Sequence, residues 1–195
     1  ANLFAEIEVK MTSFVMQQLN VDFKEANFLR DYYWKKYGTT LAGMMREHDI
    51  DPLPYLVDVH DISLTSLDVD PRLVKAIKSL AGEKIVYTNG SKFHANRVLK
   101  ARGLTECFHK IYGVEDADYL PKPEKKAYQK IIELSEINPQ YSAMFEDEYK
   151  NLDVPHDLEL RTVYLTENNY IDERHFVTDN LTEFLSRLTT NKNGN

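Results

Sequence analysis

The spacing of hydrophobic residues along the chain changes near residue 70. Before that point, apolar positions recur every three or four residues, a period that predicts helices. We expect these helices over residues 2–19, 22–37, 40–48 and 52–60. Asp22 stands where the second helix needs an N-cap, and Gly38 stands where it needs a C-terminal glycine. Residues 1–68 are therefore predicted to form a helical module.

Short apolar runs alternate with helical patterns after residue 70. Asp70 followed by Pro71 predicts the start of a helix over residues 71–80. The apolar runs, which predict strands, are residues 84–88, 109–114, 142–146 and 162–166, and the helical patterns between and after them cover 91–102, 123–136 and 178–189. This alternation predicts a Rossmann-like parallel sheet covered by helices on both faces. We therefore expect an α/β module over residues 69–190 and a frayed tail at 191–195.

The composition limits the classes of protein to which the chain can belong. Its 195 residues are enough for one domain, or for one domain with a smaller insert. The net charge of −7 argues against a general nucleic-acid-binding protein, which would carry a basic face. The chain has no signal-peptide pattern and no apolar run of the roughly 18–20 residues that a membrane span needs. We expect a cytoplasmic protein that binds neither nucleic acid nor membrane, with its single cysteine, Cys107, as a small buried side chain.

Polar residues follow the first predicted strand at once. Thr88, Asn89, Gly90 and Ser91 stand between this strand and the next helical pattern. Gly90 permits a close backbone approach, and Ser91 can cap a helix whose first N–H groups attract an anion. An ordinary strand-to-helix turn with a serine cap explains the same residues. The stretch is thus compatible with an anion site and with a plain turn.

Charged residues follow the second and third predicted strands. Lys122 stands between Pro121 and Pro123, which hold it in an extended approach. Glu146 and Asp147 end an apolar strand, where carboxylates are costly unless they are paired or bound to a metal. Hard oxygen ligands of this kind suit Mg²⁺. A surface lysine and an acid pair at the start of a helix are the structural alternatives.

These residues fall on three successive strand ends of one predicted sheet. Ligands of open α/β sheets bind beyond the carboxyl ends of the strands. We therefore expect the hydroxyl of Thr88, the cation of Lys122 and the carboxylates of Glu146 and Asp147 to share one pocket for a phosphate and a divalent metal. Asn151, four residues after Asp147, is placed to orient the acids or a nearby loop.

Three stretches resemble the motifs of a known family. They are IVYTNGS, PKPEKKAY and MFEDEYKNL, which look like motifs II, III and IV of the haloacid dehalogenase-like (HAD) phosphohydrolases. Residues 36–62, KYGTTLAGMMREHDIDPLPYLVDVHDI, resemble the cap of the pyrimidine 5′-nucleotidase branch. The resemblance covers nearly the whole chain. It implies a HAD-like α/β core with a helical cap inserted near the N-terminus.

The resemblance also implies a mechanism and a role for each residue. In the family an aspartate attacks phosphorus and forms an aspartyl-phosphate, a second aspartate serves as general acid and base, and Mg²⁺ bridges the phosphate and the carboxylates. By position, Thr88 would donate a hydrogen bond to a phosphoryl oxygen and Asn89 would line the phosphate site. Lys122 would neutralise charge on the phosphate and the nucleophile. Asp147 would bind Mg²⁺ directly, and Glu146 would bind it or support a ligand.

The chain departs from the family at motif I, the D-x-D stretch that carries the nucleophile after a first strand. The D-x-D of Asp68-Val69-Asp70 follows no apolar strand and reads as a loop and an N-cap before Pro71. We expect motif I to lie upstream of Ala1 in the intact protein. Residues 1–195 alone are then expected to be inactive and to leave two inner strand edges unpaired.

The stretch that resembles the cap contains further candidates for contact with a substrate. They are Tyr37, Thr39, Thr40, His60 and Asp61. A structural alternative exists for each group: Thr39 or Thr40 can cap the helix at 40–48, and His60 and Asp61 can form a local pair at a helix end. The aromatic residues 32–34 can stack a base or belong to the core of the helical module.

We therefore predict a Mg²⁺-dependent phosphomonoesterase that hydrolyses pyrimidine nucleoside 5′-monophosphates. A phosphatase for sugar phosphates or other small metabolites is one alternative. A catalytically inactive HAD-like module that holds a phosphorylated ligand is another. In each case the expected partner is a small phosphorylated metabolite, and the oligomeric state is left open.

Overall fold

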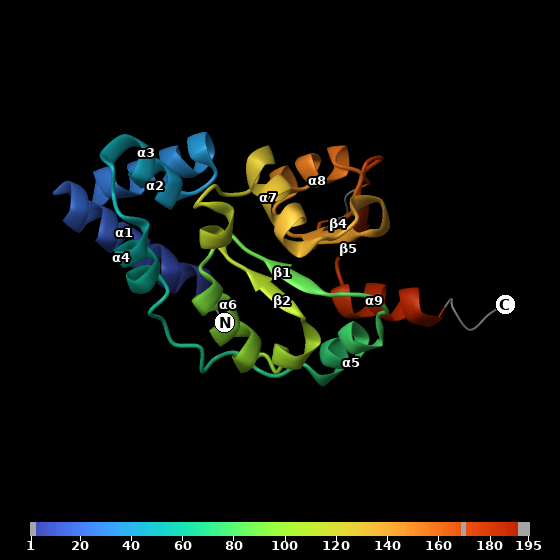
Figure 1. Ribbon diagram of the computed structural model, residues 1–195. Coiled ribbons are helices and arrows are strands. Elements are labelled where there is room, and N and C mark those ends of the chain that lie inside the picture. Colours follow the sequence, from blue (N-terminus) through green and yellow to red (C-terminus); the bar gives the residue numbers. More distant parts are fainter. Residues whose placement is uncertain (1–2, 169–170, 191–195) are drawn as a thin grey trace.

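The structure is a computed structural model that describes residues 3–168 and 171–190. Its first part is helical, as predicted: α1 (Leu3–Leu19), α2 (Phe23–Tyr37), α3 (Thr40–His48) and α4 (Pro52–Val59). These helices, called the cap below, gather on one side of the molecule (Figure 1). The predicted frayed tail, residues 191–195, lies outside the described residues.

Side-chain caps begin three of the cap helices. Asp22 accepts the N–H of Glu25 at 2.8 Å at the start of α2. Thr39 accepts the N–H of Ala42 at 3.1 Å at the start of α3, which confirms the capping alternative for this residue. Asp51 accepts the N–H of Leu53 at 2.9 Å at the start of α4. Each cap satisfies a backbone donor that the helix itself leaves unpaired, so short polar residues fix where the helices begin.

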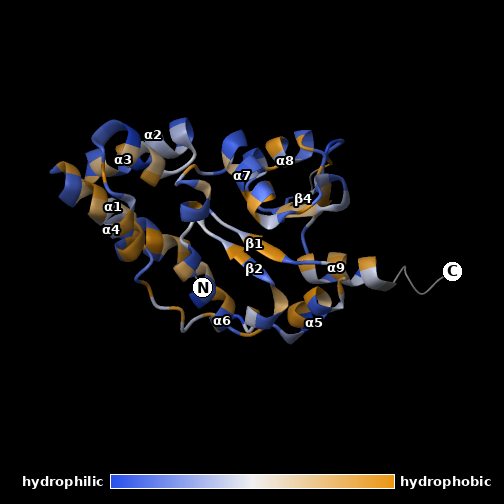
Figure 2. Cartoon of the chain, viewed as in Figure 1, coloured by the Kyte–Doolittle hydropathy of each residue, from blue (hydrophilic) through white to orange (hydrophobic). Residues whose placement is uncertain are grey.

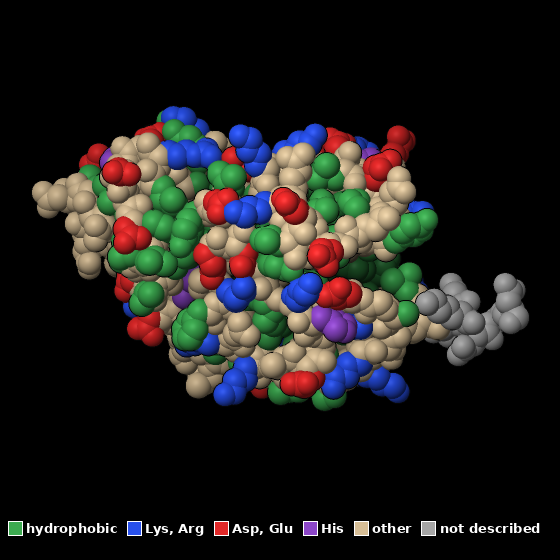
Figure 3. Space-filling view, in the orientation of Figure 1, with side chains coloured by type: hydrophobic (Ala, Val, Ile, Leu, Met, Phe, Trp, Pro, Cys, Tyr) green, Lys and Arg blue, Asp and Glu red, His purple; other side chains and the backbone are tan. Residues whose placement is uncertain are grey.

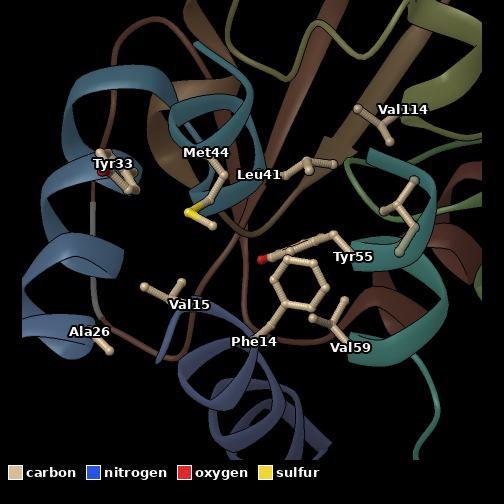
Figure 4. Close-up of a cluster of buried hydrophobic side chains, with 10 residues drawn as sticks. Phe14, Val15, Ala26, Tyr33, Leu41, Met44, Tyr55, Val59 and Val114 are labelled. Carbon is tan, nitrogen blue, oxygen red and sulfur yellow. The ribbon is translucent and has the colours of Figure 1, made fainter. Parts of the chain in front are cut away.

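The cap has its own hydrophobic core, drawn in Figure 4. Phe14 of α1 and Tyr55 of α4 meet edge to face, with ring centroids 5.1 Å apart. Tyr33 of α2 is fully buried and packs directly on Gly43 of α3, where a Cβ would lie 2.2 Å from the tyrosine ring. Tyr33 thus belongs to the hydrophobic core of the cap, and α2 and α3 approach closely because position 43 carries no side chain.

The rest of the chain alternates between helix and strand. The helices are α5 (Pro71–Ser79), α6 (Lys92–Ala101), α7 (Lys125–Ser135), α8 (Asp153–Asp157) and α9 (Leu181–Thr190). The strands are β1 (Ile85–Tyr87), β2 (Lys110–Tyr112), β3 (Ala143–Glu146), β4 (Arg161–Leu165) and β5 (Phe176–Thr178). Short 3₁₀ turns lie at residues 105–107, 114–117, 139–141 and 149–151. These elements, called the core below, form the predicted α/β fold.

The strands pair in parallel, but not in one sheet. Within residues 3–168 and 171–190 they form two ladders, β1–β2 and β3–β4–β5. The prediction of a single sheet is therefore wrong for the described chain. The prediction of unpaired strand edges is confirmed, because β1 and β3 each have a hydrogen-bonded neighbour on one side only. The physical reason is that no described strand lies between them to join the ladders.

One hydrophobic cluster packs against both ladders. Val86 of β1 and Phe145 of β3 contact it, and Leu185 of α9 is buried in it. Phe145 also meets Phe184 of α9 edge to face at 5.9 Å. Apolar residues colour β1 and β2 and appear on the helices around them in Figure 2. Side-chain packing by α9 therefore connects ladders that backbone hydrogen bonds do not.

Two elements near the C-terminal end were not predicted. β5 and α8 are three and five residues long, too short to show a hydrophobic period. The helix predicted over residues 178–189 begins at Leu181, because Thr178 belongs to β5.

The surface carries both signs of charge. Lys and Arg side chains are interspersed with Asp and Glu on the face shown in Figure 3. None of the described helices combines the length and the apolar character that a membrane span requires.

Candidate functional site

A cavity of about 880 Å³ lies between the cap and the core. Most of the site residues predicted from the sequence line it. They are Thr39, Thr40, His60, Thr88, Asn89, Lys122, Glu146, Asp147 and Asn151. Tyr37 does not line the cavity and donates its hydroxyl to Glu47 at 2.6 Å instead. Asp61 is likewise outside the lining and is exposed. The strand-end residues therefore share one cavity, although their strands belong to two ladders.

Thr88 follows β1 and keeps a donor free. Its backbone N–H continues the ladder to the carbonyl of Tyr112 at 3.0 Å, and its hydroxyl oxygen accepts the N–H of Gly90 at 3.0 Å. The hydroxyl proton makes no hydrogen bond to a described residue, so it can be donated to an oxyanion in the cavity. Ser91 is the N-cap of α6 and accepts the N–H of His94 at 3.2 Å, as the structural alternative predicts.

The side chain of Asn89 is bonded to the backbone of Lys122. Its Nδ2 donates to the Lys122 carbonyl at 3.1 Å, and its Oδ1 accepts the Lys122 N–H at 2.7 Å. Gly38 of the cap touches the same loop, since a Cβ there would lie 2.9 Å from the Lys122 carbonyl oxygen. Asn89 thus positions Lys122, and its amide has little left to offer a ligand.

Lys122 is buried, which removes the alternative of a surface lysine. Its side chain is 8% exposed and forms an ion pair with Glu146, whose side chain is equally buried. The other carboxylate oxygen of Glu146 accepts the N–H groups of Asp147 and Glu148, each at 3.2 Å. Burial disfavours the charged carboxylate, but Lys122 and these hydrogen bonds outweigh it and hold the pKa of Glu146 below its usual range. Glu146 is therefore a carboxylate at neutral pH.

Asp147 lacks an equivalent cation. Burial raises the pKa of its carboxyl group, and the neighbouring Glu146 raises it further. Lys122 is the cation that acts on Asp147, and it is already paired with Glu146. Lys122 thus offsets the charge of one carboxylate only, and a divalent cation would supply the positive charge that the carboxylate of Asp147 lacks.

The donor chemistry fits Mg²⁺, but the ligand set is partial. Carboxylate oxygens are the ligands that Mg²⁺ prefers, and they usually act together with waters and phosphate oxygens. In the described part of the chain, no group of three or more His, Cys, Asp or Glu side chains is arranged to hold a metal. Asp147 and Glu146 are the residues that would hold the ion.

Asn151 presents an unused acceptor at the cavity wall. The residue is 5% exposed, and its Oδ1 has no hydrogen-bond partner among the described residues. Its backbone carbonyl accepts the hydroxyl of Tyr128 at 2.7 Å, which ties the loop after β3 to α7. The side chain is therefore free to orient a ligand or a water, and its role as an orienting residue stays a prediction.

Lys150 and His94 line the cavity and were not singled out from the sequence, whereas Trp34 belongs to the aromatic residues 32–34, for which base stacking was one of two expectations. Trp34 of α2 and Lys150 of the loop after β3 meet across the cavity wall, with the lysine Nζ 3.4 Å from the centroid of the indole ring. Burial lowers the pKa of this lysine. His94 lines the cavity from α6.

These residues define a class of site before any comparison. A hydroxyl donor and paired carboxylates at the ends of parallel strands, with a buried cation in the same cavity, suit a phosphate and a divalent cation. A protein-family model described as haloacid dehalogenase-like hydrolase matches residues 9–155. The chain therefore belongs to the haloacid dehalogenase-like hydrolases.

Solved structures share the fold of this chain at low sequence identity. A HAD phosphatase from Thermococcus onnurineus has a TM-score of 0.61 and 14% identity, over 95% of this chain and 90% of that one. The HAD-hydrolase YfnB from Bacillus subtilis, bound to magnesium, has a TM-score of 0.61 and 15% identity, over 97% and 93%. These likenesses show the shared fold.

A curated relative matches part of its own length. Phosphate metabolism protein 8 of Saccharomyces cerevisiae is 24% identical over 158 residues, which are 73% of this chain and 49% of that protein. The chain thus spans about half the length of this relative.

Proposed function

We propose that this chain is the cap and core of a Mg²⁺-dependent phosphomonoesterase that acts on pyrimidine nucleoside 5′-monophosphates. The observation that carries the proposal is the single cavity in which Thr88, Lys122 and Asp147 meet. The resemblance of residues 36–62 to the cap of the pyrimidine 5′-nucleotidases and the name of the yeast relative support a role with phosphate compounds. The attacking carboxylate would come from a strand that lies outside residues 1–195.

Each residue of the site would have a distinct role in binding the phosphate, stabilising charge or holding the metal. Thr88 would donate its free hydroxyl proton to a phosphoryl oxygen. Lys122, held in place by Asn89, would offset charge that develops during transfer. Asp147 and Glu146 would hold Mg²⁺, which supplies charge neutralisation at the phosphoryl oxygens when it is bound.

Trp34 supports a nucleotide over a sugar phosphate. It places an aromatic ring, 43% exposed, in the wall of the cavity that contains Thr88 and Lys122. Stacking of a base on an aromatic side chain contributes about 1–3 kcal/mol, and a sugar phosphate has no aromatic ring that could stack in this way.

The test compares residues 1–195 with a form that also carries the residues preceding Ala1 in the intact protein. With Mg²⁺, the longer form is expected to hydrolyse UMP and CMP, and EDTA is expected to stop it. Residues 1–195 are expected to bind phosphate without hydrolysis. Circular dichroism beside each assay ensures that both forms are folded. Mg²⁺-dependent hydrolysis by pure residues 1–195 would show that the nucleophile is one of the acids in this chain. Binding without turnover in the longer form would favour the inactive phosphate-binding module.

Substrate choice is tested with Trp34→Ala in the longer form, using UMP and ribose 5-phosphate. Loss of stacking is expected to lower kcat/KM for UMP by about tenfold or more while sparing ribose 5-phosphate. The matched control is Phe28→Ala, because Phe28 is an exposed aromatic residue of the same helix that does not line the cavity. Equal losses for both substrates would remove Trp34 from base recognition.

A further inference from the structure

Two histidines lie face to face where the cap joins the core. His60 directly follows α4, and His94 lies in α6. Their rings are parallel to within 11°, with centroids 4.2 Å apart. Both side chains line the cavity, and His60 is 8% exposed. Only His60 was expected there from the sequence.

Contacts on one side hold the ring of His60 in place. Its Nδ1 lies 3.1 Å from the Ser91 hydroxyl. Arg97 of α6 donates to the backbone carbonyls of His60 and Ile62, at 2.7 and 2.8 Å. The connection between cap and core is therefore fastened to α6, and the ring has little freedom to turn.

The other ring nitrogen of His60 faces the site of Thr88. A Cβ built on Gly90 would lie 3.4 Å from His60 Nε2 and 3.4 Å from Thr88 Oγ1. His60 Nε2 and Thr88 Oγ1 therefore lie on either side of the same small space beside Gly90, at the wall of the cavity. A tetrahedral oxyanion in the cavity could bring one of its oxygens to each of these two atoms.

Both histidines are held in the neutral form in the free protein. Burial, with smaller contributions from the charges of His94 and Arg97, lowers the pKa of His60 to about 4 against the opposing effect of the Leu56 carbonyl. Burial and then Arg97 lower the pKa of His94, whose Nδ1 is buried without a hydrogen-bond partner in the described chain. The pair thus faces a positive neighbour and no compensating anion.

Other charged groups line the cavity at other places. They are Glu8, Arg30 and Asp31 on the cap, and Lys122, Glu146, Asp147, Glu148 and Lys150 on the core. None of these described groups contributes to the pKa shift of either imidazole. A bound anion would therefore be the first negative charge to reach the pair.

We propose that His60 and His94 are part of the anion-binding site, and that a tetrahedral oxyanion bound beside Thr88 draws one proton from solvent onto this pair. The imidazolium formed donates from His60 Nε2 to the anion. Because His60 belongs to the connection between cap and core, anion binding also fixes the cap against α6. This inference rests on the phosphate site of the proposed function, and it adds a residue from the cap connection to that site.

The test uses residues 1–195 with sulfate, a tetrahedral dianion that does not titrate near neutral pH. Calorimetry is run from pH 8.0 to 5.5 in EDTA, in two buffers of different ionisation enthalpy, so that any proton taken up belongs to the protein. Sulfate affinity is expected to rise as the pH falls, by at least tenfold across the range, with uptake of up to one proton. NMR titration of the imidazole C–H signals is expected to show a higher pKa for His60 or His94 with sulfate than without.

Three variants separate the pair from other effects. His60→Asn keeps a polar atom near the Ser91 hydroxyl but loses Nε2, and His94→Phe keeps a stacked ring without nitrogens. Each is expected to lose the proton uptake and most of the pH dependence of sulfate affinity. His156→Asn removes a histidine that does not line the cavity and is expected to bind sulfate like the parent protein.

The outcomes distinguish this inference from the proposed function. If sulfate binds, weakens with Thr88→Ala, and shows the same pH dependence in His60→Asn and His94→Phe, the histidine pair is not part of the site. Unchanged imidazole titrations in the parent protein would lead to the same conclusion even if both variants fail to fold. If the folded parent binds neither sulfate nor phosphate, the inference and the phosphate site are both wrong.

Discussion

Replacing Lys122 by methionine removes the cation from a buried ion pair and leaves a side chain of similar length. The lysine and Glu146 are each 8% exposed, so water cannot replace the lost partner. Because methionine fills most of the same space, the change leaves little cavity. The free energy of unfolding should therefore report mainly on the unpaired carboxylate of Glu146.

The expected loss of stability is about 3 kcal/mol. Removing one partner of a buried ion pair costs roughly 3–5 kcal/mol, because the other charge stays buried without compensation. The lower end applies, since Glu146 keeps the N–H groups of Asp147 and Glu148 as donors. Had the lysine been partly exposed, the stability would hardly have changed. In the intact enzyme, the same variant should lower kcat by at least about a hundredfold, because a preorganised charge at the transferring group contributes a few kcal/mol.

Urea unfolding of residues 1–195 in EDTA measures the stability term. Lys126→Met, at an exposed position in the same region, should change the free energy of unfolding by less than about 0.5 kcal/mol. The double variant Lys122→Met with Glu146→Gln should recover about half of the loss, because the amide keeps an acceptor oxygen and carries no charge. A loss below about 1 kcal/mol, or no recovery in the double variant, would refute the reasoning about the stranded carboxylate.

Three further changes test how the site is positioned. Asn89→Ala should lower the free energy of unfolding by about 1–3 kcal/mol in urea, since it leaves the N–H and carbonyl of Lys122 unpaired; no loss would mean that water replaces the amide. Gly38→Ala and Gly82→Ala both place a side chain at positive φ, but only the first meets a nearby atom, the Lys122 carbonyl oxygen at 2.9 Å. Gly38→Ala should therefore cost about 1 kcal/mol more than its control in thermal unfolding, and equal costs would contradict the contact. The pKa of His60 is lowered to about 4 in the folded protein, so between pH ~6.5 and 4 the unfolded protein binds a proton that the folded protein does not. The free energy of unfolding should therefore be highest above pH ~6.5 and should fall as the pH falls toward 4. The loss should reach up to about 3 kcal/mol and disappear in His60→Asn; a parent protein with no such slope between pH 6.5 and 4 would contradict it.

Most elements could be predicted because their signals are local. Asp22, Asp51 and Asp70 are short polar residues that stand one position before a helix, and each accepts a backbone N–H where the pattern places it. Strands β1 and β3 are apolar runs followed at once by polar residues. By contrast, β5 has only three residues, and the last of them, Thr178, was assigned to the helix predicted after it. A segment this short shows no alternation of apolar and polar residues that would predict a strand.

The candidate site could be predicted only in part. Sequence order placed Thr88, Lys122 and Asp147 at strand ends, and parallel strands bring such ends together. The pairing of Asn89 with the backbone of Lys122 joins residues 33 positions apart, and no local pattern encodes it. No local pattern encodes the stacking of His60 on His94 either, because this contact depends on where the connection between cap and core crosses α6.

The ion pair between Lys122 and Glu146 has a second consequence, because its partners belong to different ladders. Lys122 lies in the segment after β2, and Glu146 ends β3. Among the described strands, no backbone hydrogen bonds join β1–β2 to β3–β4–β5, so side chains must set the spacing of Thr88 from Asp147. The ion pair does this at the cavity, and the cluster around Phe145 and α9 does it away from the cavity. Stability and site geometry are therefore coupled at Lys122, and a variant that weakens the pair should also weaken phosphate binding.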